Sequence, residues 1–573
     1  MSDPLSLIEN DRRRRRRWPW AVAAAVVAVA VVGTGAAAVL GGGDEEPTGA
    51  ATATGPAEPV RGGTLQFALI DYQHVIDPQA GSSYAESIIA GNVVDKLTWQ
   101  DPDTGEITPW LATSWDIDDA LTEFTFHLRD DVTFSDGTPF DAEVVRANFE
   151  QYVHGDEALQ IKPNGATLLP NYVETRVVDP HTVTVVFSKP SASFLQASSF
   201  TANFQPGFLS LSTLAKNAEE RTDPANVIGT GPFVYESWTP QVSTVLVRRA
   251  GYDWAPAALK HEGEAYLDKI VFSSVPEASV RTGSLESGEV DATLDVQTTD
   301  EAPLRDKGFV VESGRVRGAD IRFDFNVGLF PTDDLAVRKA IQLGWNRDTV
   351  AKNVLTDSYE ISTSVVARAV DGWVDYSGTL LHQDVKEAER LLDDAGWAPG
   401  PDGIRVKDGK PLVVKLSGIS NLVVNKPAYE SIQQDLRKIG IDLQLTVVPI
   451  ADYTANNAKA KTDFNITAAN RSRADISVLN ITYNPTIGNA NYAPDGFEGR
   501  QELIDTLSAL ESTLDPAARH AAAEKAQDLV LEKYALTNPV YTPAQVIAHS
   551  PEVHGILFDA QARNPFVNTW KEG

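Results

Sequence analysis

Residues 411–449 read PLVVKLSGISNLVVNKPAYESIQQDLRKIGIDLQLTVVP, and this stretch predicts the class of fold. Its VVKL run predicts a strand, because short runs of β-branched and apolar residues favour strands. The middle predicts a helix, because apolar residues recur three or four positions apart until Gly440, a typical stop residue. From Ile441 to Val447 apolar and polar residues alternate, as in a strand with one buried face. The stretch is therefore interpreted as a β-α-β unit.

Strand and helix patterns also alternate through the rest of the chain after its N-terminal region, which predicts a mixed α/β architecture. Residues 384–395 carry apolar residues at helical spacing. Residues 122–128, TEFTFHL, alternate strictly, and the turn sequence SDGTP follows at 135–139. Asp141 is suited to cap a helix that runs through Phe149, because its carboxylate can accept the unpaired N–H groups of the first turn.

Length and composition limit the classes of protein that this chain can represent. A chain of 573 residues exceeds the size of a single hydrophobic core, so two or three domains are expected. The net charge of −30 argues against a nucleic-acid partner. Cysteine is absent, which excludes disulfides, thiolate metal sites, cysteine nucleophiles and a lipid-modified cysteine at a membrane boundary.

The N-terminus predicts attachment to a membrane. An Arg-rich cytoplasmic segment, 1–17, precedes the uncharged residues 18–40, which as a helix would be roughly 34 Å long and could span a membrane. Positive charge before the span places the N-terminus in the cytoplasm and the bulk of the chain outside. Residues 41–59 are rich in Gly, Pro, Thr, Ala and acidic residues and predict a flexible linker.

A cleaved signal peptide is the competing interpretation of the same segment. Arg-rich, apolar and Ala36–Ala38 segments occur in the order that signal peptidase requires, which would leave a secreted or periplasmic protein. The anchor is favoured because the apolar run is longer than the usual signal core and continues into the linker. A twin-arginine signal has little support, because any run of Arg contains a pair.

Several blocks of the chain follow one another in a recognisable order. They are GGTL at 62–65, TGEITPWLATSW at 104–115, FTFHLRDDVTFSDGTPF at 124–140, GTGPF at 229–233, LESGEVD at 285–291, FN at 325–326 with VRKAI at 337–341, and AERLLDDAGW at 388–397. In this order they resemble solute-binding protein family 5, the dipeptide, oligopeptide and nickel-complex receptors of ABC importers. The block at 124–140 resembles the family's "ytF.LR..v.F.dGtp" signature nearly position for position.

The resemblance implies a two-lobed α/β fold of the periplasmic-binding-protein type (type II, cluster C) with an inserted subdomain, preceded by the predicted transmembrane helix. Lobe one would contain residues 60–97, 226–322 and 540–573. The inserted subdomain would be residues 98–225, and lobe two would be residues 323–539.

The resemblance also implies a function without covalent chemistry or a cofactor. Such a receptor binds a peptide or similar small polar solute between its lobes and delivers it to ABC permease subunits and their ATP-binding partner. One alternative is a receptor for a metal chelate of the nickel type. An extracytoplasmic hydrolase is a further alternative, but the sequence has no GxSxG or HExxH motif to support it.

The family resemblance points to residues of lobe two that could bind the ligand. Asp475 falls where peptide receptors often place an acid for the ligand's α-ammonium group. The alternative without a ligand is an Asp that is solvated or caps a turn. Arg471 and Arg473 would share one face of a strand and could hold a carboxylate, although either could instead pair with a nearby acid. Asn470 precedes them and completes this candidate set.

Lobe one offers Asp71, Tyr72 and His74, which follow the first strand where family members present groups to the ligand. No metal site is predicted, because His74 has no second His at ligand spacing. Gly229 and Gly231 predict a tight turn rather than a phosphate loop, since the GTG sequence lacks the Lys and Ser/Thr of a P-loop.

Overall fold

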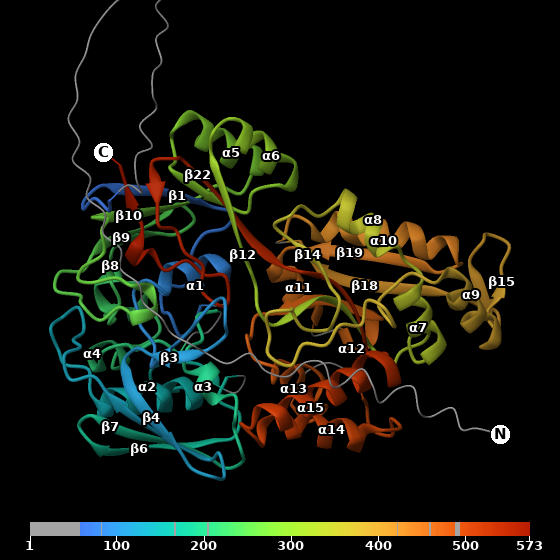
Figure 1. Cartoon of the computed structure of the whole chain (residues 1–573), viewed down its shortest axis with the longest axis horizontal. Helices are drawn as coiled ribbons and strands as arrows, with labels where there is room; N and C mark the ends of the chain where they lie inside the picture. The colour runs from blue at the N-terminus through green and yellow to red at the C-terminus, as the bar shows by residue number, and fades with distance from the viewer. Residues whose placement is uncertain are drawn as a thin grey trace, which may run out of the picture. The chain divides into compact units, whose positions relative to one another are not determined.

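The three largest β-sheets carry the fold of the computed structural model (Figure 1). The predicted transmembrane helix at 18–40 lies outside the described residues, as does most of the predicted linker. None of the helices among the described residues has the length and apolar character needed to cross a membrane. The structure describes residues 58–572 except 82, 166–167, 203–205, 421, 458–459 and 488–492.

The first sheet has seven strands that come from distant parts of the sequence. In order across the sheet they are β12 (Val310–Arg315), β22 (Ala544–His549), β11 (Ala292–Leu294), β1 (Thr64–Leu69), β10 (Lys269–Ser274), β9 (Ser243–Arg248) and β8 (Phe233–Thr239). β1 is parallel to both β10 and β11, and α5 (Ala278–Ser287) connects these two neighbours. Parallel strands need such a crossover, so the fold of this sheet depends on contacts distant in sequence.

The second sheet has six strands and contains the predicted β-α-β unit. In β18 and β19, Val413 to Ile419 pair in parallel register with Asp442 to Val448, and α10 connects them, which confirms that prediction. Across the sheet the strands are β14 (Glu360–Ile361), β21 (Thr537–Thr542), β13 (Ala319–Phe325), β20 (Ile466–Arg471), β18 (Val413–Ile419) and β19 (Asp442–Val448), and the helix is α10 (Asn425–Lys438).

The third sheet is antiparallel, with the order β4 (Ala112–Ile117), β5 (Glu123–Leu128), β7 (Thr182–Phe187) and β6 (Tyr172–Asp179). β5 has the alternating burial that its sequence predicts. Asp141 caps α2 (Ala142–His154), since its Oδ1 accepts from the backbone N–H of Val144 at 3.0 Å. The helix continues to His154, beyond the predicted end at Phe149, because its last apolar residues pack against β6 and β7.

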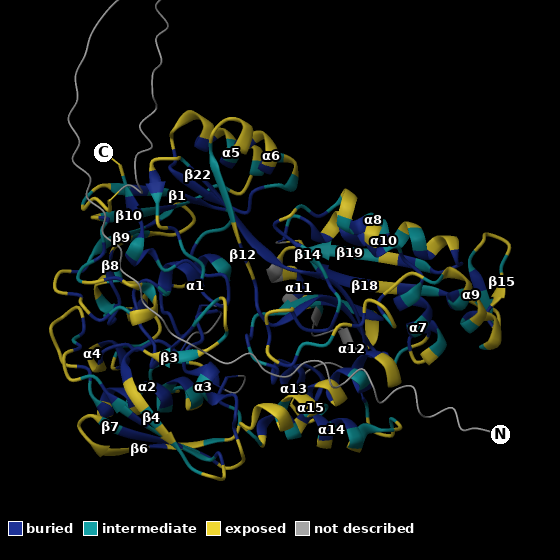
Figure 2. Ribbon diagram, viewed as in Figure 1, coloured by how far each residue is buried: buried dark blue, intermediate teal, exposed yellow. Residues whose placement is uncertain are grey.

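Two short segments cross between the seven-stranded and the six-stranded sheet. Residues 316–318 join β12 to β13, and Pro543 joins β21 to β22 (Figure 1). The apolar side chains gather in separate buried clusters, with Phe67 and Phe272 in one and Phe323 and Leu416 in another. Figure 2 shows buried residues running along the central strands of both sheets. The second cluster also takes in Ala68 of β1 and Val546 of β22, so apolar packing continues between the two sheets. Few chain crossings between two sheets are typical of two hinged lobes.

Other elements surround these sheets. They are α1 (Tyr84–Ala90), β2 (Thr98–Gln100), β3 (Ile107–Pro109), α3 (Phe194–Ala197), α4 (Leu211–Leu214), α6 (Thr298–Asp306), α7 (Leu335–Leu343), α8 (Arg347–Asn353), α9 (Val385–Asp394), α11 (Ile450–Asn457), α12 (Ala460–Asp463), α13 (Val478–Tyr483), α14 (Arg500–Ser508), α15 (Pro516–Asp528) and a π-helical turn at Leu529–Lys533. One small sheet has three strands, β15 (Ala398–Pro399), β16 (Arg405–Lys407) and β17 (Lys410–Pro411). Another has two strands, β23 (Val553–His554) and β24 (Trp570–Lys571).

Candidate functional site

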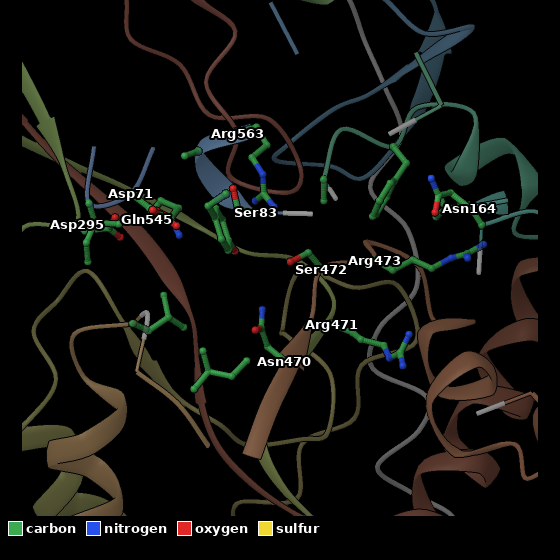
Figure 3. A pocket seen from close by; sticks show the side chains of 18 of the residues that line it. Asp71, Ser83, Asn164, Asp295, Asn470, Arg471, Ser472, Arg473, Gln545 and Arg563 are labelled. Atoms are coloured by element: carbon green, nitrogen blue, oxygen red, sulfur yellow. The ribbon is translucent and has the colours of Figure 1, made fainter. Parts of the chain in front are cut away.

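A cavity of about 350 Å³ lies where the seven-stranded and six-stranded sheets and α2 face one another (Figure 3). The end of β1, the start of α1, the end of β20 and strand β22 all contribute to its lining. Apolar side chains such as Leu168, Phe200 and Leu422 line it beside the polar groups. The polar lining residues are Asp71, Ser83, Asn164, Asp295, Asn470, Arg471, Ser472, Arg473, Gln545 and Arg563.

Arg471 and Arg473 both line this cavity, but not as neighbours on one strand. β20 ends at Arg471, and the N–H of Arg473 donates to the Arg471 carbonyl at 3.0 Å in a tight turn. The predicted strand alternation is therefore wrong, because the strand ends at Arg471. A turn after the strand, and not the strand itself, brings the side chain of Arg473 to the cavity. Asn470, the residue before them, also lines it.

Arg473 connects the cavity to a contact between distant parts of the chain. Its guanidinium is buried and donates to Ser193 Oγ at 2.7 Å. Glu511 in turn accepts from the hydroxyl and the backbone N–H of Ser193, both at 3.0 Å. Burial lowers the pKa of Arg473, and the nearby Glu511 opposes this effect. A ligand that contacts Arg473 would therefore also act on this polar chain.

Asp475 is not among the residues that line the cavity. Its Oδ1 accepts from Arg519 at 2.7 Å and from the backbone N–H of Ser477 at 2.8 Å. Burial alone would raise the pKa of Asp475, but Arg519 and these hydrogen bonds hold it at about 2. Binding of a ligand ammonium by Asp475 stays a prediction, and the ammonium would have to share this carboxylate with Arg519.

Asp71, Tyr72 and His74 form a local cluster at the end of β1. Asp71 Oδ1 accepts from the N–H of Tyr72 at 2.8 Å, and Asp71 Oδ2 lies 3.2 Å from His74 Nε2. The Tyr72 and His74 rings are 3.9 Å apart. Only Asp71 of the three is among the lining residues of the cavity. In the described part of the chain, no three His, Asp or Glu residues gather as a metal would require.

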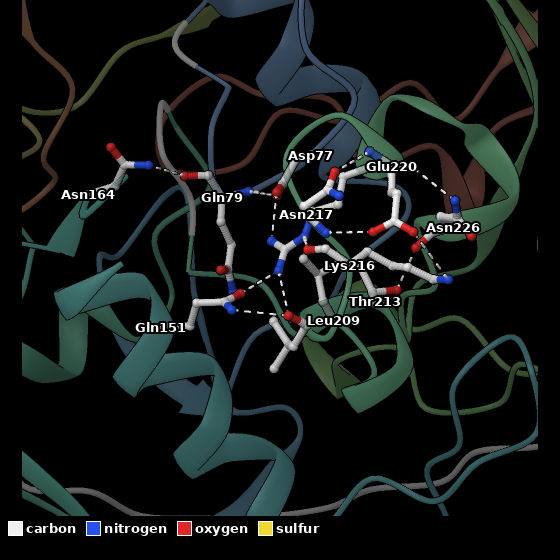
Figure 4. Close-up of polar contacts among 12 residues, drawn as sticks. Asp77, Gln79, Gln151, Asn164, Leu209, Thr213, Lys216, Asn217, Glu220 and Asn226 are labelled. Carbon is white, nitrogen blue, oxygen red and sulfur yellow. Dashed lines mark hydrogen bonds and ion pairs between the residues drawn. The ribbon is translucent and has the colours of Figure 1, made fainter. Parts of the chain in front are cut away.

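The wall formed by α2 and its surroundings is fixed by a buried arginine. Arg221 donates to Asp77 Oδ2 at 2.8 Å and bonds Gln151 on α2, which joins the segment after β1 to the inserted region (Figure 4). The backbone carbonyl of Gln79 accepts from Asn164 Nδ2 at 3.0 Å, and Asn164 lines the cavity. This network explains how Asn164 is held at the site.

Six of the polar lining residues were missed by the sequence reasoning, and Asp295, Gln545 and Arg563 are the ones with the clearest consequences for the site. Asp295 follows β11 just beyond the LESGEVD block, Gln545 lies within β22, and Arg563 lies near the C-terminus. The Arg563 guanidinium donates to Ser87 Oγ at 2.7 Å and stacks 3.7 Å from the centre of the Tyr84 ring. Sequence proximity to the family block was the one signal that could have drawn attention to Asp295.

The fold and the cavity define a two-lobed α/β protein of the solute-binding class, with a site lined by charges of both signs. The sequence model of the middle region of the bacterial extracellular solute-binding proteins, family 5, matches residues 106–491. The chain belongs to this family, as its sequence blocks predict. Members are solute-binding receptors rather than enzymes, which confirms the predicted class and removes the support for a hydrolase.

Several proteins with a known ligand or a solved structure are similar to this chain. The nickel-binding periplasmic protein of Escherichia coli (strain K12) is 28% identical over 348 residues, covering 60% of this chain and 63% of that protein. The glutathione-binding protein GsiB of the same strain is 25% identical over 458 residues, covering 78% and 82%. The structure of NikA from Brucella suis in complex with Fe(III)-EDTA has 25% identity and a TM-score of 0.73, covering 89% and 100%. DppA from Helicobacter pylori, in complex with the peptide STSA, has 23% identity and the same TM-score, covering 90% and 99%, and supports the fold.

Proposed function

We propose that this protein is the receptor of an ABC importer that binds a peptide or a similar small polar solute and delivers it to permease subunits. The observation that carries the proposal is the cavity between two sheets, lined by Arg471, Arg473 and Arg563. Guanidinium groups in a water-poor site bind carboxylates through paired, charge-assisted hydrogen bonds. The proposed solute therefore presents at least one carboxylate to Arg471.

The proposal includes the lobe boundaries that the family resemblance implies. Lobe one is assigned residues 60–97, 226–322 and 540–573, the inserted subdomain 98–225, and lobe two 323–539. The seven-stranded sheet supports the first assignment and the four-stranded sheet the second. A solute that contacts both lobes would favour their closure around it, because it binds that arrangement better than an open one.

A metal chelate is the second candidate solute. The first relative described above is a nickel-binding protein, and the NikA structure holds Fe(III)-EDTA, a metal enclosed by a polycarboxylate. The described residues contain no group of three or more metal-binding side chains, so a metal would have to arrive with its own ligands. Arg471 and Arg473 would then contact the carboxylates of the chelator.

The solute can be identified directly. Native mass spectrometry of the full-length protein, before and after mild unfolding, is expected to release a small molecule that carries a carboxylate. Calorimetry with that molecule should show a roughly ten- to hundredfold rise in Kd for Arg471→Leu, because a charge-assisted hydrogen bond is lost. Arg390→Leu, which removes an exposed arginine of α9, is the matched control. Equal affinity of the two variants would argue against a carboxylate at Arg471.

Membrane attachment is part of the same proposal, with residues 18–40 as an uncleaved single-pass anchor and the bulk of the chain outside the cell. The uncharged run and the absence of cysteine motivate it. The full-length protein is expected to remain in the membrane fraction after a carbonate wash. Intact-mass analysis provides the check, and a mature protein that begins at Val39 would show cleavage after Ala38 instead.

A further inference from the structure

At one end of the cavity, Asp295 and Gln545 carry hydrogen-bond acceptors that have no donor among the described residues. Asp71, which has Tyr72 and His74 as partners, lies at this end with them, and Arg471 and Arg473 lie at the other (Figure 3). The proposed function uses only the arginine end. Asp295 and Gln545 are both buried residues, and buried polar groups in proteins ordinarily have hydrogen-bond partners.

Both the side chain and the backbone of Asp295 have an energetically unfavourable environment. The residue is 9% exposed, and among the described residues its carboxylate takes part in no hydrogen bond or ion pair. The neighbouring Arg281 donates instead to the backbone carbonyls of Asp295, Val275 and Pro276. The backbone of Asp295 has a φ of 58°, a region that residues other than glycine seldom occupy. Arg281 compensates the charge of Asp295 only through space, and strained groups of this kind concentrate at ligand sites.

Gln545 is the second acceptor. Its side chain is 1% exposed, lines the same cavity from β22, and its Oε1 has no hydrogen-bond partner within the described chain. A buried amide oxygen without a donor costs free energy comparable to a lost hydrogen bond. The group that fits beside Gln545 and Asp295 is therefore a donor, and a positively charged donor also compensates the carboxylate.

We infer that Asp295 and Gln545, with Asp71 beside them, form a binding site for a cationic nitrogen group of the solute, an ammonium or a guanidinium. The inference rests on the proposed function, since it concerns the same cavity. It adds that the solute carries a positive group at the Asp295 end and a carboxylate at the Arg471 end. It also assigns the cation to Asp295 instead of Asp475, which has Arg519 as its internal partner.

The inferred contact depends on pH with a definite sign. Burial raises the pKa of Asp295 to about 6, and only Arg281 opposes this rise. Below that pH the carboxyl group of the empty receptor is neutral, so affinity for the cation is expected to fall as pH drops through 6. Above pH 7 the affinity should stay nearly constant for a guanidinium, whereas for a peptide ammonium it should fall again as the amino group loses its proton at about pH 8. The charged or titratable groups that interact with Asp295 are Arg281 and Tyr359. Asp71 and Arg563 line the same cavity, and His74 contacts Asp71.

Calorimetry on the full-length protein tests the inference with a set of dipeptides and tripeptides that lack Lys, Arg and His. N-acetylation of the tightest-binding peptide and the variant Asp295→Asn should each weaken binding by roughly ten- to a hundredfold. Combined, the two changes should be non-additive, because each removes one partner of the same contact. The pH dependence near 6 should also disappear in Asp295→Asn. Asp300→Asn, which removes an acid of α6 outside the cavity lining, is the matched control.

Other results would overturn the inference in distinguishable ways. Equal binding of acetylated and free peptide to the wild type would exclude an ammonium at this site and leave the receptor function intact. Loss of affinity in Asp475→Asn but not in Asp295→Asn would move the cation to Asp475. If no peptide binds the wild type at any pH, the proposed peptide receptor and the inferred site are both excluded. An acetylated peptide with a single arginine tests the guanidinium. If Asp295→Asn weakens its binding, the site takes a guanidinium; if it does not, and acetylated and free peptides also bind equally, the cation site is excluded.

Discussion

Replacing Gly318 by alanine is expected to lower both the stability of the protein and its affinity for the solute. Gly318 has a φ of 140°, and a Cβ atom there would lie 2.0 Å from the carbonyl oxygen of Arg471 and 2.7 Å from the N of Arg473. Both are backbone atoms of the turn that brings the arginines to the cavity, so the turn has to move. Overpacking together with backbone strain should lower the free energy of unfolding by about 2–4 kcal/mol.

Chemical denaturation and calorimetry on Gly318→Ala give the two readouts. Gly308→Ala is the control for backbone strain alone, because Gly308 has a φ of 91° but no atom within 4 Å of a Cβ. This control should lose about 1 kcal/mol of stability without loss of affinity. If Gly318→Ala behaved like Gly308→Ala in both measurements, the close approach of Gly318 to the backbone of Arg471 and Arg473 would not matter for binding.

Replacing Arg338 by methionine is expected to have the largest effect on stability. Arg338 is 3% exposed, and its guanidinium donates to the carbonyl oxygens of Tyr534 at 2.9 Å and Thr332 at 2.8 Å, with further bonds to Asp333 and Ala535. Burial lowers the pKa of Arg338 to about 10, so the side chain remains charged at neutral pH. Methionine would fill much of the volume and leave these carbonyls without donors.

Loss of several buried, charge-assisted hydrogen bonds should lower the free energy of unfolding by about 3–5 kcal/mol. Thermal and urea denaturation of Arg338→Met measure this change. Arg390→Met is the matched control, since its ion pairs with Glu387 and Asp394 are exposed and should contribute less than about 1 kcal/mol. Similar losses for the two variants would contradict the assignment of Arg338 as a support of the loop after the π-helical turn.

Elements that depend on local pattern could be predicted from the sequence. α10 and its two flanking strands follow from the spacing of apolar residues, and the cap of α2 follows from one acid before an apolar run. The family blocks add the order of the parts. Asn470, Arg471 and Arg473 were also placed at the cavity in advance, although the reason given for the two arginines, strand alternation, was wrong.

Partners distant in sequence could not be predicted in the same way. Asp475 was chosen by its position in a family block, but its partner Arg519 lies on α15 and approaches only when the chain folds. Gln545 has the sequence context of an ordinary buried strand residue. Nothing in its neighbours indicates that its side chain faces a cavity rather than a core.

The sequence by itself determined the α/β class, the local strands and helices, and the family, because these depend on periodicity and on motifs within short segments. Only the tertiary structure decided which charged groups share the cavity. Asp295, Gln545 and Arg471 belong to three separate segments that converge at the ends of different strands. Their roles depend on burial and on which partners other residues have already taken, such as Arg519 at Asp475. These quantities are properties of the packed chain, and no local pattern encodes them.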